Sequence, residues 1–421
     1  MKNSDEHSQF KRGVTICTFA VVICIALGCL SAGLGWLPFR IAFLLSQVVV
    51  ISLVIWQACD PFADAAQWIG IHFRLPGSVR GATLDAVASS MPELFTGIFF
   101  VVLAIMSTGE SGTITESGGE GFGASIATCA GSAVYNMILI PAICTLVISF
   151  SRKDRPTIDV ERRVLSRDGV WFMYCEIVLI AFLFSPMLHW WMAAVLIGLY
   201  VVYCLILYQD TQIHRQKTAG NRSSSKTDCT EQTELPDEAG VLFGKFQVPL
   251  NLTSAWVVIA GSTAVAAFAC YWLVNVTHSA AEQLEIPIFF VAVVLAAAAS
   301  SVPDTFLSVA AAKRGDDDGA VSNAFGSNIF DICICLTVPL LIASWMNGWQ
   351  PISLTQNGVP MPGIMELRIL LCVLSTATLG IMWHKQQLTR TKAFVLCGLY
   401  GLFVSFAVAG SLGFDLRHLL T

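Results

Sequence analysis

The sequence is poor in charged residues. Only 13% of its 421 residues are Asp, Glu, Lys or Arg, whereas 55% are hydrophobic, and the mean hydropathy is +0.69. A soluble domain of this size needs far more charge to cover its surface. The apolar residues also occur in blocks of about twenty or more, the length that spans a bilayer as a helix. We therefore expect one membrane domain with the lipid bilayer as its surroundings. The small net charge of −5 gives no reason to expect a nucleic-acid partner.

The chain also lacks the short motifs of common hydrolases and zinc centres. It contains neither H-E-x-x-H nor G-x-S-x-G, so we expect no enzymatic activity and no bound cofactor. An intramembrane enzyme and a passive channel stay open as remote alternatives. The fourteen cysteines lack the paired spacings of a zinc site and mostly lie inside apolar runs. They are interpreted as small apolar residues that fill helix interfaces.

Eleven apolar segments are predicted to cross the membrane as helices. They cover residues 13–36, 41–62, 76–106, 122–149, 169–187, 189–208, 247–274, 286–311, 319–346, 364–383 and 393–415. The first could instead be a signal segment, but its apolar stretch is longer than a usual signal core. We expect a retained, additional N-terminal helix.

The positions of Lys and Arg support this set of spans. If the N-terminus is cytoplasmic, 20 of the 24 Lys and Arg residues fall in segments on the cytoplasmic side, and Arg80 lies near the cytoplasmic end of span 76–106, which makes 21. The positive-inside rule requires such a bias. The count predicts that 209–246 and 313–318 are cytoplasmic, whereas 107–121 and 347–363 face outward. The predicted organisation is an N-terminal tail and extra span (1–40), a first repeat (41–208), a flexible linker (209–246) and a second repeat (247–421).

The two halves contain related polar motifs. Ser89-Ser90-x-Pro92-Glu93 matches Ser300-Ser301-x-Pro303-Asp304, and Gly131-Ser132-x-x-x-Asn136 matches Gly326-Ser327-x-x-x-Asp331. The first copy lies on the third predicted span and the second copy on the eighth, five positions later, and this odd difference places the copies in opposite orientations. The sequence therefore predicts an all-α polytopic membrane protein with two inverted five-helix repeats and a site at the repeat interface.

The chemistry of these motifs favours a site for hard cations. A carboxylate within a membrane span is expensive and normally faces a partner, a cavity or an ion. Glu93 shares a helix face with the hydroxyls before it, and Pro92 and Pro303 are expected to break their helices and free backbone oxygens. Oxygen ligands of this kind suit Ca²⁺ and Na⁺, whereas zinc or copper would favour His or Cys. Kinked helices with polar contacts between them are the simpler alternative.

The motifs resemble those of the cation/calcium exchanger superfamily, and most closely those of its potassium-dependent sodium/calcium exchangers. Ser90-Met-Pro-Glu-Leu-Phe-Thr96 is similar to that branch's Ser-Ala-Pro-Glu-Leu-Phe-Thr, and Gly326-Ser-Asn-Ile-Phe-Asp331 reproduces its second motif. Cys59-Asp60 resembles a further segment before the first repeat. The resemblance covers roughly residues 55–145 and 285–340.

The resemblance implies a set of ion ligands. Glu93 and Asp304 would be the central calcium carboxylates. Further side chains would bind calcium or the flanking sodium ions, and backbone carbonyls near two alanines would bind sodium: Ser90, Ser301, Ser132, Ser327, Asn136, Asp331, Ser89, Ser300, Ala86 and Ala297.

Several positions depart from the family pattern. Alanine replaces the glycine before each hydroxyl pair (Ala88 and Ala299), and Thr128 stands where Asn is common, although Asn323 is retained. Asp85 adds an acid that either creates a proton-sensitive step or pairs with a neighbouring span.

The resemblance implies an antiporter that exchanges Ca²⁺ for Na⁺, with K⁺ as an open question. Exchange of Ca²⁺ for protons is the nearest alternative, but the serine hydroxyls favour sodium. We expect an integral multi-pass protein of the plasma or inner membrane, with metal cations as substrates. The sequence does not fix its oligomeric state.

Overall fold

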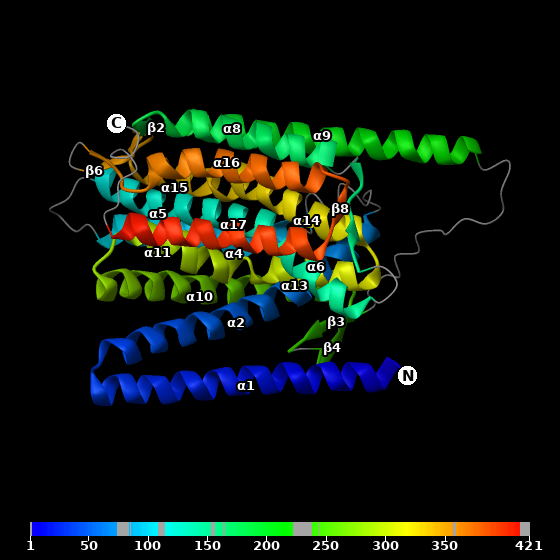
Figure 1. Cartoon of the computed structure of the whole chain (residues 1–421), viewed down its shortest axis with the longest axis horizontal. Coiled ribbons are helices and arrows are strands. Elements are labelled where there is room, and N and C mark those ends of the chain that lie inside the picture. The colour runs from blue at the N-terminus through cyan, green and yellow to red at the C-terminus, as the bar shows by residue number, and fades with distance from the viewer. Residues whose placement is uncertain are drawn as a thin grey trace.

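The fold is a bundle of long helices that lie side by side along one axis (Figure 1). The computed structural model describes residues 2–73, 84, 86–107, 114–152, 156–162, 165–221, 238–242, 244–356 and 359–412. Apolar runs in these segments form the helices, and their buried faces make one continuous core.

The first half comprises an N-terminal helix and a set of five helical segments. These are α1 (Lys2–Leu34), α2 (Leu37–His72), α4 (Ala86–Ser107), α5 (Ile114–Val134) continued by η3 (Tyr135–Leu139) and α6 (Ile140–Ser151), η4 (Leu165–Gly169) continued by α8 (Val170–Leu183), and α9 (Trp190–Asn221).

The second half repeats this order. It comprises α10 (Leu252–Leu284), then α11 (Ile288–Val291), η5 (Ala292–Ala296), α12 (Ala297–Ser300) and α13 (Val302–Arg314) as one bent unit, α14 (Asp317–Phe330) continued by η6 (Asp331–Cys335) and α15 (Thr337–Met346), α16 (Ile364–Trp383) and α17 (Arg390–Ser411).

Corresponding helices of the two halves run in opposite directions. In Figure 1, α5 begins at the end of the bundle where β2 and β6 lie, whereas its counterpart α14 begins at the end where β8 lies. The predicted all-α polytopic fold with inverted repeats is confirmed. An additional helix at the N-terminus, α1, packs against α2, where a Cβ added to Gly28 would lie 2.9 Å from the Phe43 ring.

Two short sheets show the same inverted symmetry. β1 (Ile158–Asp159) pairs with β8 (Gln387–Leu388), and β2 (Met187–Leu188) pairs with β5 (Ile352–Ser353). Each sheet joins a loop of the first half to a loop of the second half, and the two sheets lie at opposite ends of the bundle (Figure 1). The loops on both sides of α8 and of α16 are therefore linked across the repeats.

Ten of the eleven predicted spans correspond to long apolar helices. The described residues contain nine helices long and apolar enough to cross a membrane, and ten when the bent unit Ile288–Arg314 is counted as one span. The remaining prediction, 169–187, falls on η4 and α8, where Arg167, Asp168 and Glu176 dilute the apolar sequence. The first ten residues of predicted span 76–106, apart from Leu84, lie outside the described residues.

The prediction of a helix break at each proline is wrong for the first repeat. α4 continues through Pro92, whereas its counterpart breaks at Ser301 and bends by 42° before Pro303. A proline within a helix removes one hydrogen bond, and packing on both sides can keep such a helix continuous.

Both ends of the segment predicted as a flexible linker form regular structure. α9 extends to Asn221, and β3 (Glu238–Val241) pairs with β4 (Phe246–Pro249) just before α10. Residues 222–237 lie outside the described residues. A last hairpin, β6 (Thr355–Gln356) with β7 (Val359–Pro360), lies between α15 and α16.

Candidate functional site

Three acidic side chains are fully buried within the bundle. Glu93 lies on α4, Asp304 in the first turn of α13, and Asp331 at the start of η6, and each is 0% exposed. A π-helical turn begins at Tyr135 and another at Asp331, which occupy neighbouring positions of the aligned motifs. Such turns widen a helix locally and are frequent at functional sites.

Serine hydroxyl groups from both repeats lie close to Glu93. The Ser132 Oγ lies 3.1 Å from Glu93 Oε1, and the Ser301 Oγ lies 3.5 Å from the same oxygen. The two hydroxyl oxygens are 2.8 Å apart. Ser132 belongs to the first repeat and Ser301 to the second, so this cluster exists only where the repeats meet.

Asp304 has the matching arrangement from the opposite side. Ser327 Oγ and Asn136 Nδ2 each donate to Asp304 Oδ2 at 3.1 Å. Asn136 Nδ2 also lies 2.9 Å from Ser327 Oγ. Each central carboxylate is thus contacted by the serine of its own repeat's second motif, and Asn136 adds a contact across the interface.

Asp331 breaks this symmetry. Its Oδ2 lies 3.4 Å from the Ser132 Oγ, and it occupies the position that Asn136 has in the first repeat. An amide can donate a hydrogen bond to a carboxylate, but an ionised carboxylate cannot. Asp331 therefore adds acceptor oxygens beside Glu93 where the first repeat has a donor beside Asp304.

Several oxygens of the site have no hydrogen-bond partner. Glu93 Oε2, Asp304 Oδ1, Asp331 Oδ1, Ser90 Oγ and Asn136 Oδ1 are buried and unpaired. Ser132 Oγ carries one hydrogen yet lies near Glu93, Ser301 and Asp331. Buried polar atoms are normally paired, so this group of acceptors fits a site for hard cations.

Carboxylates alone do not complete such a site. Within the described residues, no group of three or more His, Cys, Asp or Glu side chains is arranged to hold one metal ion. An ion bound here would need the hydroxyl, amide or carbonyl oxygens between the acids. This is a mixed oxygen set of the kind that calcium accepts.

Four further predicted ligands form symmetric pairs in the two repeats. Ser89 Oγ donates to the Ala86 carbonyl at 3.3 Å, and Ser300 Oγ donates to the Ala297 carbonyl at 3.2 Å. All four residues are buried. The structure thus brings all twelve predicted residues into one region, and their role as ion ligands stays a prediction.

The positions that depart from the family pattern have different surroundings. Thr128 donates to the Ala124 carbonyl of its own helix at 3.0 Å, so its hydroxyl stays within α5. Asn323 donates to Ser308 at 3.1 Å and lines a cavity. Asp85 lies outside the described residues.

Two cysteines take part in the site in a way that sequence reasoning missed. Cys335 Sγ donates to the Ser90 carbonyl at 3.4 Å, and Cys270 Sγ donates to the Pro92 carbonyl at 3.5 Å. Thr96, one turn after Glu93, is also buried with an unpaired hydroxyl. Only Thr96 could have been found from the sequence, because it shares a helix face with Glu93. The cysteines in the described residues are free thiols.

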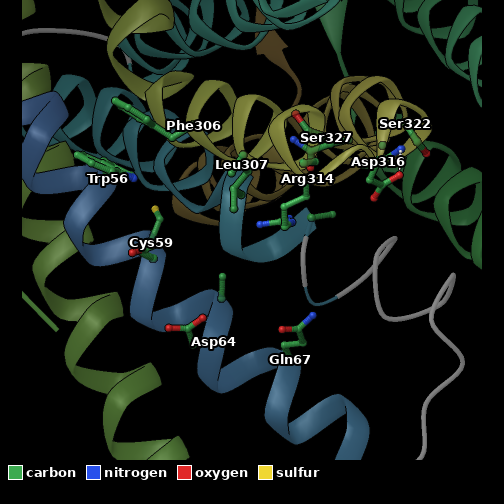
Figure 2. A pocket seen from close by; sticks show the side chains of 18 of the residues that line it. Trp56, Cys59, Asp64, Gln67, Phe306, Leu307, Arg314, Asp316, Ser322 and Ser327 are labelled. Carbon is green, nitrogen blue, oxygen red and sulfur yellow. Dashed lines mark hydrogen bonds between the residues drawn. The ribbon is translucent and has the colours of Figure 1, made fainter. Parts of the chain in front are cut away.

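A cavity of about 760 Å³ leads from one end of the bundle to this site. α2 forms one wall with Trp56, Cys59 and Asp64, and α13 and α14 form the other (Figure 2). Arg314 and Asp316 lie at its outer part, while Ser327 and the Ala86 backbone belong to the predicted ligand set. The Trp56 and Phe306 rings stack at 4.0 Å between these walls.

The two repeats differ in how tightly they pack at this depth. A Cβ added to Gly131 would lie 2.1 Å from the Val293 carbonyl oxygen, because α5 and η5 are in direct contact. Gly326 is its counterpart in the second repeat. It lines the cavity, and a Cβ there would meet no described atom within 4 Å. The site is therefore open on one side and closed on the other.

Comparison with known proteins gives a consistent result. Residues 43–209 and 254–409 match the family model described as "Sodium/calcium exchanger protein". Over 148 residues, the chain is 32% identical to the Sodium/potassium/calcium exchanger 2 of Gallus gallus and 34% identical to the Sodium/potassium/calcium exchanger 1 of Homo sapiens. These segments are 35% of this chain but only 22% and 13% of the two relatives, less than a quarter of their lengths.

Solved structures of low sequence identity share the fold. The H+/Ca2+ Exchanger CAX aligns with a TM-score of 0.58 at 14% identity, over 94% of this chain and 95% of that one. The sodium-calcium exchanger NCX_Mj, soaked with sodium and strontium, aligns with a TM-score of 0.51 at 18% identity, over 86% of this chain and 98% of that one.

Proposed function

Because the chain belongs to the sodium/calcium exchanger protein family, we propose that it exchanges Ca²⁺ for Na⁺ across a membrane by alternating access. It is an integral multi-pass membrane protein, and a plasma or inner membrane is the proposed location. The transported cations are its substrates, and we expect neither a cofactor nor an enzymatic activity.

The buried oxygen cluster at the repeat interface carries this proposal. Glu93 and Asp304 each lie among hydroxyl groups, and each keeps one carboxylate oxygen unpaired. Two negative charges and several neutral oxygens suit a dehydrated divalent cation. We assign calcium to the space between these two carboxylates.

The flanking oxygens are the proposed sodium ligands. The pairs formed by Ser89 with the Ala86 carbonyl and by Ser300 with the Ala297 carbonyl lie symmetrically in the two repeats. Neutral hydroxyl and carbonyl oxygens fit a monovalent ion better than a proton, which binds to one basic atom. Their presence favours sodium as the coupling ion.

Energetics also favour several monovalent ions. Moving Ca²⁺ out of a cell against about 100 mV costs about 4.6 kcal/mol, at about 2.3 kcal/mol for each charge. Entry of three or more monovalent cations offsets this cost, which requires more than one site beside the calcium ion. The oxygen pairs on both sides of the carboxylates supply such sites.

The one-sided cavity supports alternating access. The open side lies at the end of the bundle that carries Lys313 and Arg314, which is the predicted cytoplasmic end. Inverted repeats can exchange their conformations, so that the closed contact at Gly131 opens when the contact at Gly326 forms. The conformation described here would then be the inward-facing one.

Calcium flux in vesicles tests the exchange. Purified protein would be reconstituted into vesicles loaded with sodium, and uptake of calcium would be followed after dilution into sodium-free medium. We expect uptake only with an outward sodium gradient, whereas lithium or choline should not replace it. Uptake driven by a pH gradient without sodium would instead identify a Ca²⁺/H⁺ exchanger.

A further inference from the structure

Glu176 is a buried acid outside the candidate cation site. It lies near the middle of the continuous helix formed by η4 and α8, and it is 1% exposed. Neither repeat motif includes it. Acidic residues inside membrane spans are rare and usually functional, so its surroundings need an explanation.

One hydroxyl group is the hydrogen-bond partner of this carboxyl group. Ser375 Oγ on α16 donates to Glu176 Oε1 at 2.8 Å. Glu176 Oε2 is buried and has no hydrogen-bond partner. Thr378 lies one turn beyond Ser375 on α16, and its hydroxyl is also buried and unpaired.

The nearest buried cation on α16 does not neutralise it. The Arg368 guanidinium lies 4.8 Å from the centre of the Phe184 ring, at the far end of α8. Seven residues separate Arg368 from Ser375, which is about 10 Å along a helix. Within the described residues, no ion pair includes Glu176.

Within the described side chains, the other elements that pack against α8 bring no cation to Glu176 either. On η4, Arg167 pairs with Asp168. The titratable groups on α9, η6 and α16 include the phenols of Tyr200 and Tyr203, the thiols of Cys204, Cys333, Cys335 and Cys372, the acids Asp331 and Glu366, and Arg368. From α14, the Phe325 ring contacts Phe172 of α8.

We propose that Glu176 is a proton-binding site, occupied by a proton in this conformation and separate from the cation site. A buried charge without a cation and with one hydrogen bond is far more costly than a neutral carboxyl group with one unmet bond. A metal ion would need several more oxygens than one free carboxylate oxygen and two hydroxyls provide. The neutral acid accepts from Ser375 at Oε1 and carries its proton on Oε2.

Proton binding at Glu176 links the packing of α8 and α16 to pH. The folded protein holds a proton that the unfolded chain releases at neutral pH, so stability must fall as the pH rises. α8 also packs against α14 and η6, which carry Ser327 and Asp331. Ionisation of Glu176 would therefore loosen helices that support the cation site.

Infrared spectroscopy of the protein in lipid tests the protonation directly. Carboxylic acids and carboxylates absorb at different frequencies, and only the acid band shifts when the proton is exchanged for deuterium. We expect the wild-type spectrum at neutral pH to contain an acid band that is missing in Glu176→Gln. Ser375→Ala should keep this band but shift it, because the carbonyl oxygen loses its hydrogen bond.

Thermal unfolding at increasing pH is the second readout. Wild-type protein should lose stability as the pH rises from about 4.3, the ordinary pKa of a glutamate, until Glu176 ionises in the folded protein. Glu176→Gln, which is neutral at every pH, should lose clearly less. An acid band of equal intensity in wild type and Glu176→Gln, or equal losses of stability over this pH range, would overturn the inference. If Glu176→Gln folds poorly, the shifted band in Ser375→Ala decides the question. Neither readout depends on which ions the protein exchanges.

Discussion

Glu93 and Asp304 are each contacted by polar side chains of both repeats. We predict that Glu93→Gln and Asp304→Asn each abolish calcium exchange while the protein still folds. Each change keeps the side-chain volume and removes one charge from a buried ion site, which costs about 3 to 5 kcal/mol. That corresponds to about a hundredfold or greater loss of calcium affinity. Calcium uptake into vesicles measures the effect.

The matched control is an acid at the surface of the same bundle. Glu282→Gln removes the same charge from the exposed face of α10 and should leave uptake unchanged. Size-exclusion profiles of all three variants would show that they are folded. Near-normal uptake by Glu93→Gln or Asp304→Asn would contradict the assignment of calcium to these residues.

Asp331 is the residue at which we expect a further cation to bind. It adds a charge beside Glu93 where the first repeat has the neutral Asn136, and one of its oxygens is buried without a partner. A further cation would neutralise this charge, and potassium is the candidate that the sequence resemblance implies. We predict that external potassium stimulates sodium-driven calcium flux, and that Asp331→Asn removes this stimulation while some exchange remains.

The potassium prediction is measured with lithium or choline in place of potassium at constant ionic strength. Asn136→Gln is a suitable comparison, because it changes the matching position without changing the charge. If flux in the unmodified protein does not respond to potassium, Asp331 would instead be a sodium or proton ligand.

At single positions, the sequence predicted the site residues that belong to motifs present in both repeats. Every polar residue of the two motifs had a partner in the other repeat, and the structure brings these residues together. Cys270 and Cys335 had no such signal, because a thiol that donates to a backbone carbonyl has the same sequence context as one that fills a helix interface. Glu176 lies inside the predicted span 169–187, but its partner on α16 could be recognised only from the structure.

The open and the closed side of the site differ in how tightly individual helices pack there. Gly131 packs against the Val293 carbonyl, whereas Gly326 faces the cavity. We predict that Gly131→Ala disfavours the present conformation and Gly326→Ala favours it. Overpacking of this kind costs about 1 to 3 kcal/mol, which changes the ratio of the two conformations by about fivefold to 150-fold.

Labelling of a cysteine in the cavity reports this ratio. With the native Cys59 of the cavity wall replaced by alanine, Ala310→Cys on the α13 wall should react with a thiol reagent more slowly in the Gly131→Ala background. It should react at least as fast in the Gly326→Ala background. Gly198→Ala on α9 is the control, because a Cβ there meets no atom of the described residues within 4 Å and Gly198 does not line the cavity. Equal labelling rates in all backgrounds would show that the two glycines do not govern access.

The apolar runs of the sequence predicted where most helices lie, but they did not predict the local geometry of the backbone. Pro92 and Pro303 occupy equivalent positions, yet only the second repeat breaks there. The break depends on what packs around each proline, which the sequence does not state. The strands β1, β2, β5 and β8 could not be predicted either, because each forms only through pairing with a loop about 165 or 230 residues away.

For the whole molecule, the distribution of cations predicts the orientation in the membrane. Residues 209–246 and 313–318 should lie on one side, and 107–121 and 347–363 on the other. The positions of β3, β8 and α13 at one end of the bundle, and of β2 and β6 at the other, agree with this grouping (Figure 1).

Single cysteines in these four loops test the orientation. In a background without reactive thiols, an impermeant reagent should label 107–121 and 347–363 from outside the cell. The other two segments should be labelled only after the membrane is opened. Labelling of 107–121 and 209–246 from the same side would contradict the inverted topology.

The two sheets that join the repeats also set an order for biosynthesis. Ribosomes release the chain from its N-terminus, and Ile158 and Met187 must wait for partners at Leu388 and Ser353. The first repeat therefore enters the membrane with two unpaired loops, one on each side. A nascent chain stopped after Asn221 should be cut at these loops by protease, whereas the finished chain should resist cleavage. Completion of the protein thus coincides with protection of its earliest loops, so that a quality-control protease could distinguish half-made chains from finished ones.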